Sequence, residues 1–444
     1  MDGNGGIRAV KSPTAFGYKP SIYNHYKAIE HDTYLVYNLV TSSVALLTEN
    51  EKTQVEHPER ADAIFLESAL ENGFAVPVDE NEVAKVLTIQ RMNNYSSRFA
   101  GFQILPTTAC NASCRYCYEK GLEKETMSSE VIEAIPGYLE SYMDMIDDLH
   151  VTWFGGEPML GLQAMRELSE AIKGKCGLHG IGYTSDIITN ATLLTPETVE
   201  ILADECNVSQ AQVTLDGMGS THMDRKRYLD PSFTFDKLLD SMELLVRERI
   251  RLLIRLNIDR ENIGECIELI SKLGDKWARN DNVMLYAAPL YGSDNDNEYF
   301  GQGELNDAYG LIFKAMINAG WIQTLDGLPM NFNNATCSAR MVNNFVINPK
   351  GEIFKCEHLL SDADERLGTV FDGVTFNSAL VRWTSPTLPQ RCIECGYLPS
   401  CQGGCYAAET RNFGFERCPH IAFIEEAIVS SAGYLLKRNQ GKGE

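Results

Sequence analysis

Three cysteines lie close together in the stretch CNASCRYCYE, residues 110–119: Cys110, Cys114 and Cys117. A closed structural zinc site takes four ligands, and a cubane iron–sulfur cluster is usually held by four thiolates. Three thiolates on a tight loop can hold three irons of a 4Fe–4S cluster and leave the fourth iron open. The spacing therefore predicts a cluster that binds and activates another molecule.

A second, larger group of cysteines lies near the C-terminus. It comprises Cys337, Cys356, Cys392, Cys395, Cys401, Cys405 and Cys418. Zinc ribbons also use closely spaced cysteines, although seven ligands fit two sites imperfectly with either metal. The three remaining cysteines, Cys176, Cys206 and Cys266, are scattered singly and are expected to be small core hydrophobes.

Strand-like runs and amphipathic stretches alternate in residues 96–325, between the two cysteine groups. The runs occupy 102–107, 150–154, 184–189, 209–215, 251–258 and 282–288. Amphipathic stretches at 129–146 and 234–250 predict helices, and Thr195 and Pro196 form a typical helix start. About six β–α units predict an α/β fold with a partial (β/α)6 TIM barrel rather than the full eight units.

Glycine and polar residues follow the strand-like runs at one place in each unit. They read FGGEP (154–158), TNAT (189–192), TLDG (214–217), RLN (255–257) and APLY (288–291). Each alone is typical of an ordinary turn between a strand and a helix. Because the carboxyl ends of parallel strands share one face of a barrel, where active sites lie, their convergence beside the Cys110 loop predicts a catalytic site there.

Residues 1–95 have a different character from the barrel region. Residues 23–48 predict two or three short strands, and 59–74 predicts a helix. No catalytic constellation is visible in this part. A small module with an open sheet edge can bind an extended peptide by strand addition, and the alternative is that it only packs against the next domain.

The composition excludes several classes of partner. The chain has 444 residues and a formal charge of −22, from 39 basic and 61 acidic residues, which repels a nucleic-acid backbone. The first residues hold no apolar signal segment, and no apolar run is long enough to span a bilayer. We therefore expect a cytoplasmic protein without a membrane partner, whose cysteines are metal ligands or core residues rather than disulfides.

The Cys110 loop and the GGEP stretch together resemble the signatures of radical S-adenosylmethionine (radical SAM) enzymes. The resemblance implies that the methionine part of SAM binds the open iron, and that reductive cleavage of SAM gives a 5′-deoxyadenosyl radical that abstracts a hydrogen atom. Tyr116 would lie against the adenine. Gly155 and Gly156 would let the backbone approach SAM, and Glu157 would accept a hydrogen bond from its ammonium group.

The same resemblance implies weaker assignments at three further strand ends. Thr189, Asn190, Thr214 and Asp216 stand where the family usually contacts the ribose and the carboxylate of SAM. Each can instead belong to an Asx-turn or a cap.

The C-terminal cysteines, within residues 326–425, resemble the SPASM domain, which carries auxiliary 4Fe–4S clusters. By this resemblance Cys392, Cys395, Cys401 and Cys418 hold one auxiliary cluster, and Cys337, Cys356 and Cys405 hold the other, for three clusters in all. The second set is one cysteine short, which predicts an open iron suited to a substrate thiolate. A non-cysteine ligand or one of the scattered cysteines is the alternative.

Glu357 follows Cys356 directly, where sulfatase-maturating enzymes of this branch place a proposed catalytic carboxylate. It would accept the substrate proton, and the alternatives are a turn cap or an ion pair with Lys355. Residues 426–444 are expected to form a C-terminal helix and tail.

These resemblances imply a radical SAM maturase of ribosomally made precursor peptides, with residues 1–95 similar to a leader-recognition domain and a flavodoxin or ferredoxin as electron donor. An auxiliary cluster with an open site favours an intramolecular Cys thioether, as in sactipeptides and ranthipeptides. A carbon–carbon or carbon–oxygen crosslink and the oxidation of Cys or Ser to formylglycine are alternatives within the class. A non-catalytic iron–sulfur carrier is a remote alternative, because it has no use for the GGEP stretch.

Overall fold

The computed structural model describes residues 17–290, 299–328, 337–407 and 421–440. Its central feature is a sheet in which six neighbouring strands run in the order β11-β10-β9-β8-β7-β6, all parallel. These strands are β6 (Phe99–Thr107), β7 (Asp148–Gly155), β8 (Gly182–Thr189), β9 (Val208–Leu215), β10 (Arg251–Ile258) and β11 (Val283–Pro289). They coincide with the six predicted runs, and the partial barrel is confirmed.

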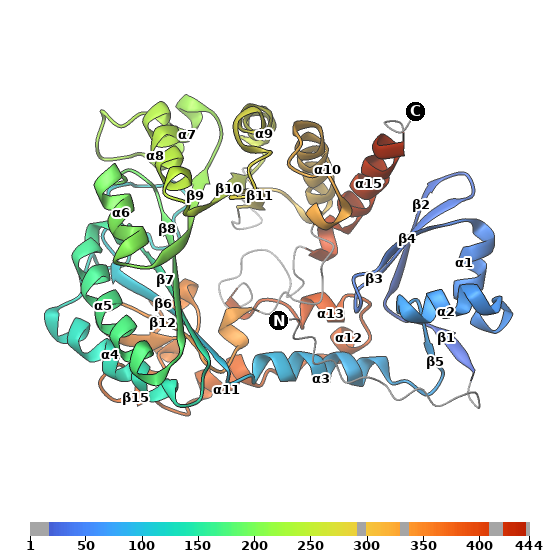
Figure 1. Cartoon of the computed structure of the whole chain (residues 1–444), viewed down its shortest axis with the longest axis horizontal. Helices are drawn as coiled ribbons and strands as arrows, with labels where there is room; N and C mark the ends of the chain where they lie inside the picture. Colours follow the sequence, from blue (N-terminus) through green and yellow to red (C-terminus); the bar gives the residue numbers. More distant parts are fainter. Residues whose placement is uncertain (1–16, 291–298, 329–336, 408–420, 441–444) are drawn as a thin grey trace.

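Helices cover the outer face of these strands (Figure 1). They are α4 (Ser129–Met143), α5 (Leu162–His179), α6 (Pro196–Asp204), α7 (Gly219–Lys226), α8 (Phe235–Arg247), α9 (Ile263–Trp277) and α10 (Gln302–Ala319), with a 3-10 turn η2 (Pro158–Gly161) before α5. The start of α6 is as predicted: the Thr195 side chain accepts from the Thr198 N–H, the Thr198 side chain in turn accepts from the Thr195 N–H, and Pro196 is the first helical residue.

The C-terminal cysteine-rich region continues the barrel sheet. Strand β12 (Asn344–Ile347) pairs in parallel with β6, and β13 (Glu352–Phe354), β14 (Gly368–Thr369) and β15 (Gly373–Val374) follow in antiparallel order. The expected domain boundary near residue 325 therefore separates the two regions in sequence but not in the sheet.

Short elements carry the rest of this region. They are η3 (Leu325–Gly327), η5 (Ser338–Arg340), η6 (Glu357–Leu359), η7 (Ala363–Glu365), α11 (Ser378–Thr384), α12 (Gln390–Ile393) and α13 (Leu398–Cys401). The final helix α15 (Ile421–Gln440) begins five residues before the expected 426 and packs against α10.

The N-terminal part holds a pair of short strands, β1 (Tyr18–Pro20) with β5 (Ala75–Pro77), and an antiparallel sheet in the order β2-β3-β4. The sheet strands are β2 (Asn24–Glu30), β3 (Thr33–Asn38) and β4 (Val44–Leu47). Helices α1 (Glu49–Glu56), α2 (Ala63–Glu71) and α3 (Glu82–Asn94) follow, with a turn η1 (Pro58–Arg60) after α1. The strands predicted within 23–48 are all present, and the helix predicted over 59–74 is shorter, because Asp62 caps it.

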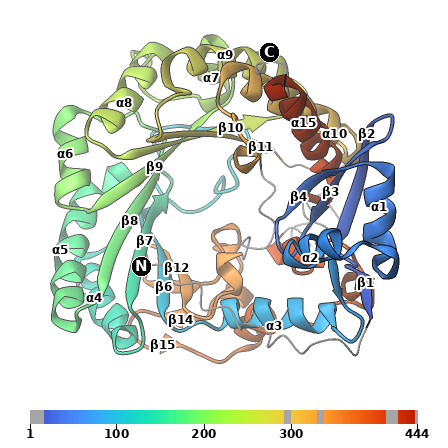
Figure 2. The same ribbon diagram turned by 45° about the vertical axis from the view of Figure 1, so that its right-hand side comes forward.

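In two views of the molecule, α3 runs from this N-terminal part to the start of the barrel, and the cysteine-rich segment lies between the two (Figures 1 and 2). Helix α15 lies between α10 and β2 and contacts both. Among the helices of the described residues, none combines the length and apolar character needed to cross a membrane.

Candidate active site

The first cysteine group lies on the loop that follows β6. Cys110, Cys114 and Cys117 are all half-buried, and the Cys117 N–H donates to the Cys114 carbonyl at 3.3 Å. Burial raises the pKa of the Cys110 thiol to about 11, and the neighbouring Cys114 and Cys117 thiols act in the same direction. The structure thus gathers the three thiols as predicted, in surroundings where a bound metal would supply the positive charge that ionises them.

Gly155 and Gly156 bring the end of β7 against this loop. A Cβ at Gly155, whose φ is +127°, would lie 2.2 Å from the Thr107 carbonyl oxygen, and one at Gly156 would lie 2.4 Å from the Ala109 carbonyl oxygen. Two backbone hydrogen bonds, Gly156 N–H to Thr107 and Glu157 N–H to Ala109, join the same segments at 3.2 and 2.9 Å. In the structure, these glycines approach the backbone that leads into the cysteine triad. Their approach to SAM, which the resemblance implies, stays a prediction.

The buried Glu157 carboxylate joins the ends of β7 and β8. Its Oε1 accepts from the Met159 N–H at 3.1 Å and the Thr189 hydroxyl at 2.7 Å, and its Oε2 accepts from the Asn190 N–H at 2.7 Å. Burial raises the pKa of Glu157 to about 7, against the effect of these hydrogen bonds. Each carboxylate oxygen accepts two bonds, so Oε2 keeps an acceptor position for a ligand ammonium group.

Asn190 forms the Asx-turn that the sequence left open as an alternative, and its contact with SAM stays a prediction. Its Oδ1 accepts from the Thr192 N–H at 3.0 Å, which closes an Asx-turn. Its Nδ2 donates to Asn111 Oδ1 at 2.8 Å and contacts Cys110 Sγ at 3.9 Å. The turn therefore directs the Asn190 amide at the Cys110 loop.

Tyr116 and Asp216 meet at the end of β9. The Tyr116 hydroxyl donates to the two Asp216 carboxylate oxygens at 2.8 and 2.6 Å, and Asp216 is fully buried. Thr214, the remaining predicted strand-end residue, is half-buried two positions earlier. The hydrogen bond fixes the Tyr116 ring beside the cysteine triad, where the resemblance places the adenine.

Lys226 completes this cluster and was not predicted from the sequence. Its side chain is 7% exposed, with Nζ 3.6 Å from Asp216 Oδ2 and 5.5 Å from the Tyr116 ring centroid. Burial alone would lower the pKa of Lys226, but Asp216, Tyr116 and Cys114 raise it well above its usual value. Only the run of three basic residues at 225–227, ten residues after β9, hints at this buried cation.

The end of α7, which carries Lys226, also supports the Cys110 loop. The N–H groups of Ser113 and Arg115 donate to backbone carbonyls of Lys226 and Arg225, each at 3.1 Å. The Arg115 and Arg225 side chains share Glu261, with N–O distances of 2.9 and 3.3 Å. The loop is thus held between the end of β7 and the end of α7.

His222 of α7 accepts a hydrogen bond from the Asp216 backbone. Its Nδ1 accepts from the Asp216 N–H at 3.2 Å, and its Nε2 lies 2.9 Å from the Tyr228 hydroxyl. Burial lowers the pKa of His222 to about 3, although Asp216 acts in the opposite direction. The imidazole is therefore neutral at physiological pH.

The second cysteine group is split between two places, and one of them holds Cys337, Cys356 and Cys405. Burial raises the pKa of the Cys356 thiol well above its usual value, and Glu357, Cys337 and Cys405 all raise it further. Residues separated by up to 68 positions in sequence therefore meet. The grouping that the SPASM resemblance implies for these three is the one that the fold brings together.

The loop that carries Cys405 is fixed from two sides. The buried Arg340 guanidinium donates to the backbone carbonyls of Gln402 and Gly404, the latter at 2.5 Å. The Tyr406 hydroxyl donates to the buried Glu365 carboxylate at 3.2 Å. These contacts hold the Cys405 loop against η5, which directly follows Cys337.

Glu357 lies between the two cysteine groups. Glu119, two residues after Cys117, is buried, and its pKa is raised to about 7 by burial and by Glu357. The Tyr118 ring centroid lies 4.1 Å from that of His358, which follows Glu357. Lys355 donates instead to two backbone carbonyls, so the Glu357–Lys355 pair that the sequence left open does not form.

Cys392, Cys395 and Cys401 lie on α12, α13 and the turn between them. The Cys395 N–H donates to the Cys392 carbonyl at 3.3 Å, and Cys395 Sγ accepts from the Tyr397 N–H at 3.5 Å. Cys418, the fourth member of the predicted set, lies outside the described residues.

The scattered cysteines behave as predicted for small core hydrophobes. Cys176, Cys206 and Cys266 are at most 2% exposed and belong to the main apolar core of the barrel. Burial raises the pKa of each thiol.

The described residues contain no group of three or more His, Cys, Asp and Glu side chains that converges closely enough to hold one metal ion. A cubane cluster makes a different demand, because each thiolate binds its own iron and the sulfurs stay apart. The two sets of mutually interacting thiols, Cys110 with Cys114 and Cys117 and Cys337 with Cys356 and Cys405, fit that demand.

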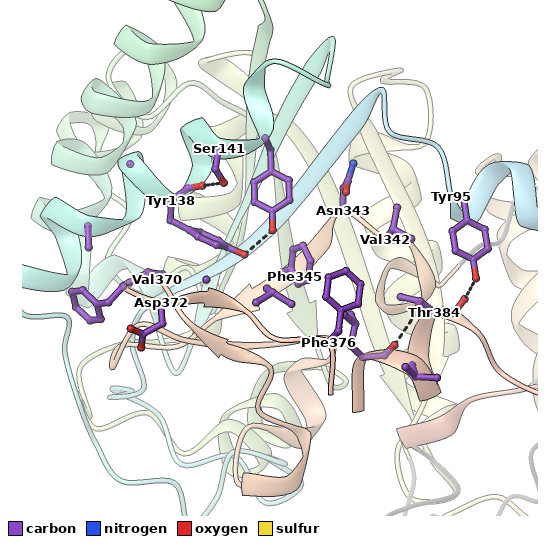
Figure 3. A pocket seen from close by; sticks show the side chains of 18 of the residues that line it. Tyr95, Tyr138, Ser141, Val342, Asn343, Phe345, Val370, Asp372, Phe376 and Thr384 are labelled. Carbon is purple, nitrogen blue, oxygen red and sulfur yellow. Dashed lines mark hydrogen bonds between the residues drawn. The ribbon is translucent and has the colours of Figure 1, made fainter. Parts of the chain in front are cut away.

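A large cavity of about 1020 Å³ lies away from these thiols (Figure 3). Tyr138 and Tyr142 of α4 line one side, and Phe371, Phe376 and residues of α11 line the other. None of the predicted site residues contributes to its wall. The predicted site is therefore identified by its residues and not by this cavity.

Comparison with known families matches residues 104–273 to the Radical SAM superfamily. The chain is 23% identical over 326 residues to the serine-type anaerobic sulfatase-maturating enzyme of Klebsiella aerogenes, which is 67% of this chain and 77% of that protein. It is 22% identical over 334 residues to the cysteine-type enzyme of Clostridium novyi, covering 68% and 87% of the two chains.

Solved structures show the same fold. The structure of anSMEcpe with bound AdoMet and Cp18Cys peptide aligns with a TM-score of 0.61 at 17% identity, over 77% of this chain and 99% of that one. The structure of Streptococcus suis SuiB bound to precursor peptide SuiA aligns with a TM-score of 0.50 at 15% identity, over 89% of this chain and 97% of that one.

Proposed function

We propose that this radical SAM enzyme, whose radical SAM domain spans residues 104–273, matures a ribosomally made precursor peptide by forming an intramolecular crosslink, a thioether from a peptide cysteine. One observation carries the proposal. The residues that follow the first cysteine triad, Tyr118 and Glu119, interact with the residues that follow Cys356. A substrate held there would lie between a radical-generating site and a second group of thiols.

The groups implied by the fold would be held by the residues already described. Cys110, Cys114 and Cys117 would bind the cluster that, when reduced in the presence of SAM, supplies a 5′-deoxyadenosyl radical for hydrogen-atom abstraction. The remaining seven ligand assignments are those implied by the SPASM resemblance, which gives three 4Fe–4S clusters in total. The electron donor would be a flavodoxin or a ferredoxin.

The SAM pocket would be formed by this chain's own polar groups. The buried Lys226 ammonium is suited to the carboxylate of the methionine part, because a desolvated ion pair with good geometry is strong. Glu157 Oε2 offers an acceptor position for the ammonium group, and Tyr116, fixed by Asp216, offers an aromatic face for the adenine.

Thioether formation removes two hydrogen atoms from the peptide, one from carbon and one from sulfur, and joins the two atoms. One leaves as a hydrogen atom taken by the deoxyadenosyl group, and the other leaves as a proton and an electron. Glu357 is the proposed proton acceptor, since its carboxylate lies beside Cys356 and close to Glu119. The electron would leave through the auxiliary centres.

A substrate thiolate suits the Cys337 group in particular. Three thiols provide ligands for three irons of a cubane cluster, and among the described residues the Cys337 set has no fourth cysteine. Sulfur ligands suit iron. This is why the thioether is proposed ahead of a carbon–carbon or carbon–oxygen crosslink.

Formylglycine formation is the second candidate, and the similarity to sulfatase-maturating enzymes favours it. The alignment with anSMEcpe includes 99% of that protein but leaves 23% of this chain unmatched. The SuiB alignment extends over 89% of this chain. A larger shared portion with a protein solved with its precursor peptide supports the peptide-maturase proposal, with residues 1–95 as the leader-binding part.

The edges of the N-terminal sheet are the proposed place for the leader. Within the described part of the chain, strands β2 and β4 each pair on one side only, with β3. An extended peptide can add a strand to such an edge through backbone hydrogen bonds. A cytoplasmic location follows from the proposal, because the reducing compartment keeps the thiols available. Nucleic acid stays excluded as a partner by the charge of −22.

The first experiment separates the two cysteine groups. Cys114→Ala should abolish SAM cleavage by the reduced enzyme. Cys405→Ala should keep much of that cleavage and lose the peptide product, because Cys405 lies with Cys337 and Cys356. Equal loss of SAM cleavage in both variants, with the fold intact by circular dichroism, would contradict this division.

The product is read by anaerobic co-expression with a short Cys-containing peptide encoded beside the gene, followed by high-resolution mass spectrometry with thiol alkylation. Loss of two hydrogens together with one alkylatable thiol supports the thioether. Loss of two hydrogens with every thiol still alkylatable indicates a carbon-centred crosslink. Conversion of Cys or Ser to an aldehyde, trapped with a hydrazine, indicates formylglycine.

A further inference from the structure

The RLN stretch at the end of β10 has no role in the thiol groups or in the SAM pocket described above. Its first residue, Arg255, is half-buried, whereas Ile254 and Leu256 on either side of it are fully buried in the apolar core. Since successive side chains of a strand point to opposite faces, Arg255 lies on the face opposite to the helices, which cover the outside of the strands (Figure 2). This is the inner face of the partial barrel, near the carboxyl ends of the strands, where active sites lie.

Arg255 stands in one row with polar residues of the two neighbouring strands. Its register partners are Thr214 of β9 and Tyr286 of β11, and both are half-buried. Thr214 lies two residues before Asp216, whose carboxylate accepts the hydrogen bond from Tyr116. The row therefore begins beside the proposed adenine site and extends across the inner face, and Arg255 is its cation.

The guanidinium group of Arg255 is fixed by its neighbours but has no counter-ion. Its Nε donates to Asn257 Oδ1 at 2.9 Å. The adjacent Tyr286 hydroxyl donates to Gln212 Oε1 at 2.8 Å, and burial raises the pKa of Tyr286 while Arg255 acts in the opposite direction. Within the described parts of the chain, Arg255 forms no ion pair. Because a guanidinium group has five N–H donors, most of them remain for a ligand.

The acidic side chains that directly follow β9 and β10 already have cations. The Asp216 carboxylate lies 3.6 Å from Lys226 Nζ, and Asp259 is paired with Arg225. The chain has 61 acidic and 39 basic residues, so a shortage of carboxylates does not explain an arginine without an acidic partner. A partly buried charge without a counter-ion is costly, which favours a ligand that supplies one.

We propose that Arg255 binds a carboxylate of the peptide substrate, the side chain of an Asp or Glu close to the residue from which the hydrogen atom is taken. The arginine fork matches a carboxylate with two parallel N–H···O bonds, which fix its orientation as well as its position. SAM has a single carboxylate, for which Lys226 is the proposed partner, so a second cation on this face is suited to a different anion. The inference rests on the proposed function, and it adds that the modified segment of the peptide is acidic.

The test uses the reduced holoenzyme, SAM and the precursor peptide encoded beside the gene, with each Asp and Glu of the peptide changed in turn to Asn or Gln. With the wild-type enzyme, one such change should lower kcat/KM for product formation at least about tenfold, as expected for the loss of a hydrogen bond between charged groups. With Arg255→Met, the same change in the peptide should have almost no further effect, because the pair is already broken. Arg255→Lys should keep part of the discrimination, since it retains the charge but not the fork.

Arg251→Met is the matched control. Arg251 lies on the same face of the same strand, at the exposed start of β10, and its guanidinium group contacts Met284 Sδ. This variant should form product from every peptide at the wild-type rate. Arg255→Met should keep the wild-type affinity for SAM in the absence of peptide. Its urea unfolding midpoint should be unchanged or raised, because no ion pair within the protein is lost, whereas a merely structural role of Arg255 would lower it.

Three results would overturn this inference and leave the proposed function intact. The first is product formation that tolerates every Asp and Glu replacement, and the second is a sensitivity to the peptide change that persists in Arg255→Met. The third is a loss of SAM affinity in Arg255→Met without peptide, which would assign Arg255 to SAM. Failure of the proposed function looks different, because the wild-type enzyme would then cleave SAM and leave the mass of the precursor peptide unchanged, and the inference would fall with it.

Discussion

Replacing Gly156 with alanine should displace the Cys110 loop. The added Cβ would lie 2.4 Å from the Ala109 carbonyl oxygen and 2.6 Å from the Ala109 carbonyl carbon and the Thr108 carbonyl oxygen, all of them backbone atoms. The Ala109 carbonyl must withdraw by about 1 Å to reach an ordinary contact. That movement strains its 2.9 Å hydrogen bond from the Glu157 N–H.

The expected magnitude follows from these contacts. Overpacking of this kind costs about 1–3 kcal/mol, and a weakened hydrogen bond costs about 1 kcal/mol more. A displacement of about 1 Å at a reacting centre can lower a rate on the order of 100-fold. We therefore expect Gly156→Ala to lose on the order of 99% of SAM cleavage.

The assay must separate an effect on the loop from an effect on SAM binding. If Gly156 serves the loop, the variant will show lower iron content and an altered paramagnetic resonance spectrum of the SAM-binding cluster before any SAM is added. If it serves only SAM, the SAM-free spectrum will match the wild type and only the affinity for SAM will fall. The latter result would refute the reasoning.

Gly174→Ala is the matched control for this experiment. Gly174 is an exposed residue of α5, and a Cβ there would have no atom within 4 Å. The same substitution in an open helical position should stabilise the protein by about 0.5–1 kcal/mol and leave SAM cleavage unchanged.

Four further predictions concern the residues around the two cysteine groups. Lys226→Met should destabilise the protein by about 3–5 kcal/mol in urea unfolding and weaken SAM binding, because Asp216 is left buried without its cation, whereas Lys226→Arg should retain part of both. Arg340→Ala should lower the auxiliary iron content while SAM cleavage persists, because the Cys405 loop loses two backbone contacts, and the exposed Arg366→Ala should not. Glu357→Gln should keep SAM cleavage and lose at least tenfold in peptide product by mass spectrometry, and product at the wild-type rate would exclude the proton-acceptor role. Glu394→Gln, at the exposed residue that directly follows α12, is the control. His222 is neutral in the folded protein because burial lowers its pKa to about 3, whereas in the unfolded chain it takes up a proton near pH 6.5. The contribution of His222 to the free energy of unfolding should therefore be full above pH 6.5 and fall by up to about 1.4 kcal/mol per pH unit below it. Urea unfolding at several pH values should show that His222→Gln removes this part of the pH dependence.

The barrel could be predicted because its information is local. Each strand is a short apolar run with alternating burial, such as Val208–Leu215, and each is followed by a polar turn. Thr195 with Pro196 marks the start of α6 in the sequence alone. Since parallel strands place their carboxyl ends at one edge, the pattern also predicted which turns would lie beside the cysteine triad.

The partners within the site could not be predicted, because they depend on contacts between distant residues. Nothing local to Lys226 shows that it would be buried against Asp216, and nothing local to Glu119 shows that Glu357 would lie beside it. The Asx-turn of Asn190 was foreseen as an alternative, whereas the bond from its amide nitrogen to Asn111 on the Cys110 loop was not. Lys355, two residues before Glu357, was considered as its ion-pair partner, but its ammonium group donates to backbone carbonyls instead.

The pairing of β12 with β6 explains how the two cysteine groups come to meet. β6 leads into Cys110, and β12 lies beside it in register, with Phe345 opposite Phe102. The chain then turns back along β13 and enters η6, which carries Glu357 and His358. The parallel pairing of β12 with β6 thus places the C-terminal cysteine-rich region next to the strand that leads into the cysteine triad. A peptide bound beside Tyr118 and η6 would therefore lie close to both cysteine groups.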